Sequence, residues 1–172
     1  LSEEDKNQLR LFADTHHVQF WLQPNGSDSI SCFYPPHPQL HYTLPEFGVT
    51  LAFLPTDFTQ VNPQMNQILV GQALKLLQVQ AHECVLDLFC GIGNFTLPLA
   101  TQASKTLGIE GSAALCERAQ HNAVHNQLAH KVRFMSQNLF EIDMQHIMQW
   151  GKFDRWLLDP PRDGALALVR AL

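Results

Sequence analysis

The chain has 172 residues, of which 45% are hydrophobic and 16% are charged. This balance excludes a disordered chain and is typical of one folded domain, alone or with a small appendage. The formal net charge of −5 argues against a general basic surface for nucleic acid. The sequence has no run of about 18 apolar residues, so no segment is expected to span a membrane.

The first 57 residues combine one helical pattern with several short β-type runs. Ser2 precedes an acidic turn, after which apolar residues recur at helical spacing and predict a short amphipathic helix. Turn residues, including Pro45-Glu46-Phe47-Gly48, separate strands predicted over 18–22, 30–34, 40–44 and 49–54. We expect these strands to form a small antiparallel meander, so that residues 1–57 make a small α+β subdomain.

Helical and β-type segments alternate through the remaining residues, 58–172. Pro63 begins a helix, where its missing N–H costs little. The alternation predicts a parallel sheet with right-handed crossovers, an α/β arrangement. It predicts strands over 85–89, 105–110, 132–135 and 156–159, and helices over 95–102, 112–128 and 139–149. Because the chain stops in a helical pattern after the fourth of these strands, we expect a truncated sheet whose exposed edge favours self-association.

The first parallel strand has an acidic residue near its end, and a pair of glycines follows it. Asp87 in the strand and Gly91 and Gly93 in the following turn form an arrangement of the kind that holds a polar ligand at the carboxyl edge of a parallel sheet. Thr96 stands where a dinucleotide fingerprint has glycine or alanine, which disfavours a nicotinamide-dependent oxidoreductase. Asn94 either caps the following helix or turns its side chain into the site.

Polar residues also follow the other three strands. Glu110 either accepts hydrogen bonds from ribose hydroxyls or stabilises the next helix through its dipole. Asn138 stands where adenine-edge contacts are usual, or it caps the next helix. Asp159 ends the fourth strand, and Pro160-Pro161 stiffen the chain directly after it.

Three motifs in this order resemble the RNA uracil-5-methyltransferases, and most closely the branch that acts on 23S ribosomal RNA. The motifs are Phe58-Thr59-Gln60-Val61-Asn62, Asp87-Leu88-Phe89-Cys90-Gly91-Ile92-Gly93-Asn94-Phe95 and Leu158-Asp159-Pro160-Pro161-Arg162-x-Gly164. The resemblance extends over most of the chain and implies a Rossmann-like, S-adenosylmethionine-dependent methyltransferase core over residues 58–172. The implied cofactor-binding residues are Gln60, Asp87, Phe89, Gly91, Gly93, Asn94, Glu110, Asn138 and Asp159.

The resemblance also implies a mechanism. A cysteine thiolate adds to C6 of the target uracil, C5 takes the methyl group, and a general base removes the C5 proton. The family's nucleophile lies in a Ser-Cys-Asn-Pro motif after a fifth strand, and its base is a later glutamate. Since neither segment is present, we expect both beyond Leu172 and expect this fragment itself to be inactive. We interpret Cys90 as a packing residue.

Other segments of the family are also missing from these residues. Its RNA-binding β-barrel and the cluster-binding cysteines of the ribosomal branch would precede Leu1, so an iron–sulfur cluster is expected only there. His121 and His125 lie four residues apart near Cys116, but no third ligand is evident and we expect no metal site. The four cysteines form no C-x-x-C pair, which favours a reduced, cytoplasmic protein.

Two alternative functions stay open. The first is a methyltransferase for an exocyclic amine of RNA or DNA, although such enzymes usually have Tyr or Phe where Arg162 stands. The second is a module that binds S-adenosylmethionine without catalysis. The preferred prediction is methylation of C5 of a uridine in ribosomal RNA by a longer protein.

Overall fold

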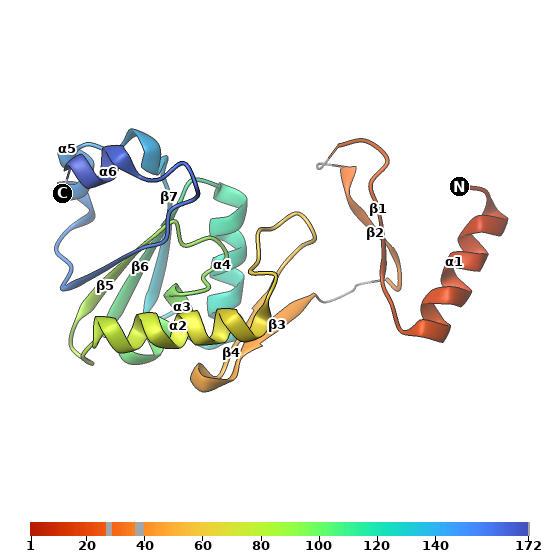
Figure 1. The fold of residues 1–172 in the computed structure, drawn as a ribbon, viewed down its shortest axis with the longest axis horizontal. Coiled ribbons are helices and arrows are strands. Elements are labelled where there is room, and N and C mark those ends of the chain that lie inside the picture. The colour runs from red at the N-terminus through yellow and green to blue at the C-terminus, as the bar shows by residue number, and fades with distance from the viewer. Residues whose placement is uncertain (27–28, 37–39, 172) are drawn as a thin grey trace. The chain divides into compact units, whose positions relative to one another are not determined.

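The computed structural model describes residues 1–26, 29–36 and 40–171, which form two compact units (Figure 1). The first unit comprises Leu1–Leu40 and Phe53–Asp57, and the second comprises His41–Ala52 and Phe58–Leu172. This division differs from the expected boundary at residue 57, because the segment 41–52 belongs to the second unit. None of the described helices is long and apolar enough to cross a membrane.

The first unit contains the predicted N-terminal helix and one hairpin. Helix α1 spans Glu3–His16 and begins with a capping box, in which Ser2 Oγ accepts from Asp5 N and Asp5 Oδ2 accepts from Ser2 N. Strands β1 (Phe20–Leu22) and β2 (Ser31–Tyr34) pair antiparallel. The short local patterns of this part of the sequence therefore produce the expected elements.

The second hairpin belongs to the second unit. Strands β3 (His41–Leu44) and β4 (Val49–Ala52) pair antiparallel across the 3₁₀ turn η2 (Pro45–Phe47). The expected single meander is wrong, since β2 and β3 are not paired within the described residues. Side chains of helix α4 and its C-cap bond the edge of β4 instead: Asn122 bonds Ala52 N and O, and the C-cap residue Asn126 bonds Thr50 N and O.

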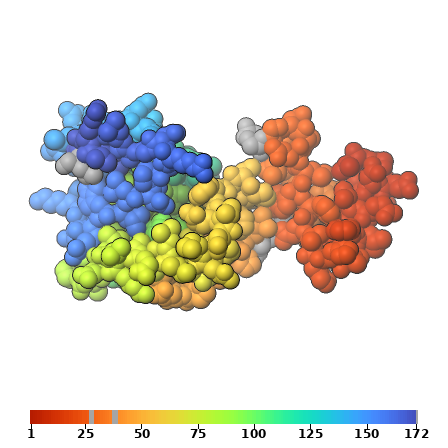
Figure 2. Space-filling view, in the orientation of Figure 1, coloured from red at the N-terminus to blue at the C-terminus, as the bar shows by residue number. Residues whose placement is uncertain are grey.

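The centre of the second unit is a parallel sheet, which confirms the predicted α/β fold. Its four strands are ordered β7-β6-β5-β8, so the chain reverses direction across the sheet beside β5. Helix α2 lies along the surface of the unit (Figure 2). The elements are α2 (Pro63–Leu77), β5 (Cys84–Leu88), α3 (Thr96–Gln102), β6 (Lys105–Glu110), α4 (Ala113–His125), β7 (Val132–Ser136), η3 (Leu139–Glu141), α5 (Met144–Trp150), β8 (Arg155–Leu158) and α6 (Leu166–Ala171).

The predicted helix over 139–149 is divided into η3 and α5. Asp143 caps α5, because its Oδ1 accepts from His146 N at 3.0 Å and its own backbone is extended. An extended residue at this position ends the preceding turn and starts a new helix. The single-helix prediction was therefore wrong in this segment.

Successive side chains of β5 point to opposite faces of the sheet. Leu86 and Leu88 are fully buried on one face, in a cluster that also contains Ile109, Leu139, Ile142, Ala165 and Leu168. Asp87 lies between them in the sequence and therefore faces the other side, where it bonds Thr96 of α3. The strand thus carries a carboxylate into the interior next to its carboxyl end.

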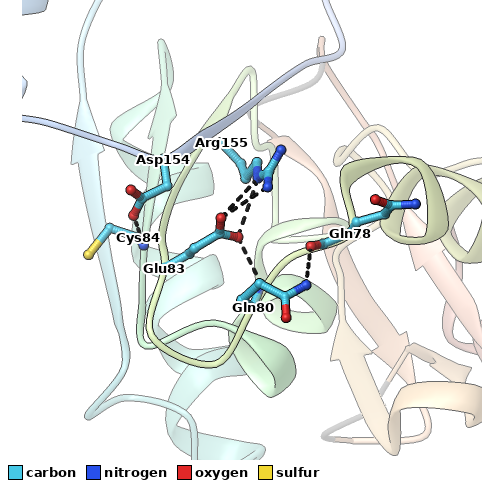
Figure 3. Close-up of polar contacts among 6 residues, drawn as sticks. All are labelled: Gln78, Gln80, Glu83, Cys84, Asp154 and Arg155. Atoms are coloured by element: carbon cyan, nitrogen blue, oxygen red, sulfur yellow. Dashed lines mark hydrogen bonds and ion pairs between the residues drawn. The ribbon is translucent and has the colours of Figure 1, made fainter.

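The amino ends of β5 and β8 are joined by a polar cluster (Figure 3). Glu83 Oε1 accepts from Arg155 Nη2 at 3.0 Å, and Glu83 Oε2 accepts from Gln80 N at 2.8 Å. Asp154 Oδ2 accepts from Cys84 N, and Cys84 O accepts from Asp154 N. These bonds place β8 beside β5, where β8 forms one edge of the described sheet.

Candidate cofactor site

The glycine turn leaves β5 through three residues in the left-handed region. Phe89 has φ 66°, Gly91 has φ 55° and Gly93 has φ 95°. The N–H groups of Phe89 and Cys90 both donate to Ile109 O, at 2.9 and 3.1 Å, which holds the turn against β6. Positive φ explains the two glycines, since side chains rarely tolerate it. At Phe89 the same conformation is strained and must be held by these surrounding bonds.

Asp87 is fully buried beneath this turn. Its Oδ2 accepts from Thr96 Oγ1 at 2.5 Å, whereas its Oδ1 has no hydrogen-bond partner within the described residues. Burial raises the pKa of Asp87 to about 7, with Asp159 and Glu110 adding to the rise and Thr96 opposing it. The buried carboxyl is therefore only half satisfied at the end of the strand where ligands bind in parallel sheets.

The carboxylate of Glu110 bonds the backbone at the start of α4, which is the second of the two roles considered for it from the sequence. Its Oε2 accepts from Gly91 N at 3.1 Å and its Oε1 accepts from Ser112 N at 3.0 Å. Ser112 is the N-cap of α4, so the carboxylate links the glycine turn to the start of that helix. A carboxylate can accept about four hydrogen bonds, which leaves acceptor capacity for ligand hydroxyls.

Asn94 does not cap α3, because the capping position belongs to Phe95, which makes no side-chain cap bond. Its amide instead pairs reciprocally with Asn66 of α2, in two bonds of 2.9 Å. Tyr42 of β3 also donates to Asn94 Oδ1 at 2.9 Å. Sequence reasoning missed Tyr42 and Asn66, since they stand 52 and 28 residues from Asn94 and belong to no motif.

Asn138 is an exposed N-cap. Its Oδ1 accepts from Phe140 N at 3.0 Å at the start of η3. This is the capping role that the sequence left open for it. The residue follows β7, two strands away from β5, and is not among the residues that line the cleft at the glycine turn.

Five of the predicted residues meet at one cleft in the second unit. The segment 58–60, the glycine turn and the end of β8 come together there, although they are far apart in the sequence. Asp159 is exposed, its N–H donates to Leu88 O at 3.4 Å, and partial burial raises its pKa. The cleft is lined by Tyr42, Phe58, Thr59, Gln60, Phe89, Cys90, Gly91, Ile92, Asn94, Phe95 and Asp159.

Cys90 and Cys116 do not have the properties of activated nucleophiles. Cys90 reaches the cleft, but it is 4% exposed and burial raises the pKa of its thiol. A Cβ added to Gly108 would stand 2.9 Å from its Sγ, which shows how closely it is packed. Burial also raises the pKa of Cys116. Within the described residues, no group of three or more His, Cys, Asp and Glu side chains is placed to hold a metal ion.

Residues 48–165 match the family described as "tRNA (Uracil-5-)-methyltransferase". The chain belongs to this family. The match confirms the resemblance drawn from the three motifs, and it includes the glycine turn and most of the residues that line the cleft.

Two similar relatives are named 23S rRNA (uracil(1939)-C(5))-methyltransferase RlmD. The protein of Cupriavidus pinatubonensis is 59% identical and that of Cupriavidus necator is 58% identical, each over the whole chain. The chain spans 37% and 39% of their lengths. A solved tRNA (uracil-54, C5)-methyltransferase of Pyrococcus abyssi, in complex with S-adenosyl-L-homocysteine, is 25% identical. It has a TM-score of 0.64, and the match covers 77% of this chain and 31% of that one.

Proposed function

We propose that this chain supplies the methyl-donor site of a longer RNA uracil-5-methyltransferase that modifies a uridine of 23S ribosomal RNA. The observation that carries the proposal is the convergence of all three family motifs on one cleft, through Gln60, Phe89 and Asp159. The identities favour ribosomal RNA over transfer RNA, because the relatives named for 23S rRNA are 58–59% identical and the solved tRNA enzyme is 25% identical.

The chemistry of the cleft fits S-adenosylmethionine. Glu110 is an acceptor with free capacity, as ribose hydroxyls require. The exposed carboxylate of Asp159, which lines the cleft, favours a cation, such as a sulfonium or an ammonium group. Asp87 lies beneath the glycine turn and is not among the residues that line the cleft. Phe89, whose ring centroid is 5.6 Å from that of Phe140, offers an apolar surface for a purine.

In this proposal the site residues of this chain bind or orient the cofactor, and none of them forms a covalent bond to the RNA. S-adenosylmethionine, when bound, supplies the methyl group. Asp87, Gly91 and Gly93 shape the turn, while Gln60 and Asp159 approach the cleft from two other segments. Asn138 stays a candidate for the adenine edge beyond β7. The proposal assigns the thiolate to a segment outside this chain, because Cys90 and Cys116, the two cysteines next to the glycine turn and at α4, are buried and burial raises the pKa of their thiols.

We propose ribosomal RNA as the partner of the longer protein and the cytoplasm as its location. The ribosomal names of the relatives and the four unpaired cysteines support both statements. We also propose that the isolated chain self-associates through β8, since this strand is an edge of the described sheet. Light scattering over a range of concentrations tests this last proposal, and a monomer at every concentration contradicts it.

The first experiment is calorimetric titration of the folded chain with S-adenosylhomocysteine, with NAD⁺ as the control ligand. Selective binding of S-adenosylhomocysteine is the expected result. If neither the folded chain nor the longer protein binds S-adenosylhomocysteine, the proposal is contradicted.

A second experiment tests the substrate with the longer protein. Methyl transfer to 23S rRNA transcripts, and not to transfer RNA, is expected, with 5-methyluridine as the product in nuclease digests. A methylated exocyclic amine would support the alternative target instead. Cofactor binding without any product would leave the chain as part of a binding module.

A further inference from the structure

The amide of Asn94 is held from two sides at the edge of the cleft. Its Oδ1 accepts from Tyr42 Oη and from Asn66 Nδ2, each at 2.9 Å, and its Nδ2 donates to Asn66 Oδ1 at 2.9 Å. Asn66 is 3% exposed, so the reciprocal pair is sheltered from water. Neither Tyr42 nor Asn66 belongs to the three motifs that define the family resemblance.

A count of donors and acceptors shows which atom of Asn94 is available to a ligand. An amide oxygen has two lone pairs, and both are used by Tyr42 and Asn66. The amide nitrogen has two hydrogens, of which the reciprocal pair uses one. The second N–H therefore points away from Asn66, and Asn94 lines the cleft.

The hydroxyl of Tyr42 is a dependable donor in this arrangement. The side chain is half-buried, and burial raises the pKa of the phenol, so its proton is retained at neutral pH. Since the hydroxyl donates to Asn94 Oδ1, rotation of the Asn94 amide alone, with Asn66 and the hydroxyl proton in place, would break both bonds to that oxygen. In the structure, the two partners thus hold the Asn94 amide with its oxygen toward Tyr42 and Asn66.

The position of Tyr42 is itself set by the hairpin β3–β4. Asn122 on α4 and Asn126 at the C-cap of that helix bond the backbone of Ala52 and Thr50 on β4. Asn122 Nδ2 also donates to Ile92 O at 3.1 Å, inside the glycine turn. The hairpin and the turn are therefore bonded to the same helix, and a shift of one would strain the bonds of the other.

We propose that Tyr42 and Asn66 are positioning residues of the cofactor site, which hold Asn94 so that it offers an N–H donor and not its oxygen to the ligand. This inference rests on the proposed function and names the ligand group. S-adenosylmethionine carries a strong acceptor in the carboxylate of its amino-acid part, whereas its ribose hydroxyls suit the acceptor Glu110. Asn94 then binds that carboxylate.

Two ligands separate positioning from a merely structural effect. The chain is titrated with S-adenosylhomocysteine and with its decarboxylated analogue, which keeps the amine and lacks the carboxylate. For Tyr42→Phe we expect about fivefold weaker binding of S-adenosylhomocysteine, the size of one weakened hydrogen bond. Binding of the decarboxylated analogue stays unchanged. The matched control is Tyr34→Phe, which removes a hydroxyl bonded to Asp14 in the first unit.

A second variant keeps the test decisive if Tyr42→Phe does not fold. Asn94→Asp preserves the shape of the side chain but has no N–H to offer, and its charge repels a carboxylate. We expect it to weaken S-adenosylhomocysteine at least about tenfold and to leave the decarboxylated analogue unaffected or tighter. Equal losses for both ligands in either variant would overturn the inference, and so would no loss at all.

The outcome for the unmodified chain separates this inference from the proposed function. If the folded wild-type chain and the longer protein both bind neither ligand, the cofactor assignment fails and the inference fails with it. If wild type binds S-adenosylhomocysteine and the variants lose no carboxylate preference, only the positioning role is contradicted.

Discussion

At the amino end of β5, Glu83 has both carboxylate oxygens bonded, whereas at the carboxyl end Asp87 has one oxygen without a partner in the described part of the chain. Arg155 and the N–H of Gln80 lower the pKa of Glu83, with Arg155 the larger cause. Burial raises the pKa of Asp87. The carboxylate at one end of the strand therefore has hydrogen bonds to both oxygens, whereas the carboxylate near the other end has a hydrogen bond to only one oxygen within the described residues.

This difference shows where the strand is built for stability and where it is built for a ligand. The bonds of Glu83 and Arg155 join two neighbouring strands (Figure 3). Asp87, by contrast, lies beneath a turn with left-handed backbone at Phe89. Unsatisfied polar groups and strained backbone are tolerated where function requires them. Four substitutions test this comparison, from the largest expected effect to the smallest.

Asp87→Asn should stabilise the chain above pH 7 and change the pH dependence of its stability. Because its pKa is raised from 3.8 to about 7, Asp87 contributes stability that is present below about pH 4 and lost as the pH rises through 7. Three pKa units correspond to about 4 kcal/mol. An unpartnered amide N–H offsets part of this, so we expect a gain of about 1–3 kcal/mol.

Urea denaturation between pH 4 and 8 measures this effect. The variant should lack the fall in the free energy of unfolding that the wild type shows between pH 4 and 7. Asp163→Asn, at an exposed position, is the matched control. If the free energy of unfolding depends on pH in the same way in Asp87→Asn and in wild type, burial of the Asp87 carboxylate does not destabilise the chain.

Arg155→Met should lower the melting temperature by several degrees, because Glu83 is 8% exposed and would lose its charged partner. The lowered pKa of Glu83 means that its contribution is present above pH 4.5 and is lost as the pH falls through the folded value. Circular dichroism melts at neutral and acidic pH measure both effects. Arg162→Met, which removes an exposed arginine, is the control. An equal fall in its melting temperature would remove the contrast between the two ends of β5.

Glu110→Ala should weaken S-adenosylhomocysteine binding by roughly 2 kcal/mol, through the loss of charged hydrogen bonds to the ribose. The loss of the bonds from Gly91 N and Ser112 N should also reduce thermal stability slightly. Calorimetry and melts compare this variant with Glu117→Ala, an exposed carboxylate on the helix α4 that follows Glu110. An unchanged dissociation constant would exclude the ribose assignment.

Cys90→Ala should have the smallest effect, because Cys90 is a packing residue with a raised thiol pKa. We expect cofactor affinity within about twofold of wild type, with only the stability cost of one small buried atom. Mass spectrometry after treatment with iodoacetamide provides a direct check. Rapid alkylation of Cys90 in the native chain would contradict its assignment as an inert residue.

Local patterns predicted most elements of this fold correctly. The capping signal at Ser2, the proline at the start of α2 and the alternation after residue 63 each depend on neighbours within a few residues. The break at Asp143 was missed, since its capping bond competes with a continuous helical pattern. The meander was mispredicted because β4 finds its edge partners on α4, some 70 residues away.

The sequence by itself determined the family, the order of strands and helices and five residues of the cleft, because these follow from short motifs and from periodicity. Only the tertiary structure decided that Asn94 pairs with Tyr42 and Asn66, and that Asn138 caps η3. It also decided that Asp87 has one oxygen without a hydrogen-bond partner among the residues that the structure describes. The orientation of an amide or a carboxylate depends on groups that packing brings from distant segments, and no local pattern contains them.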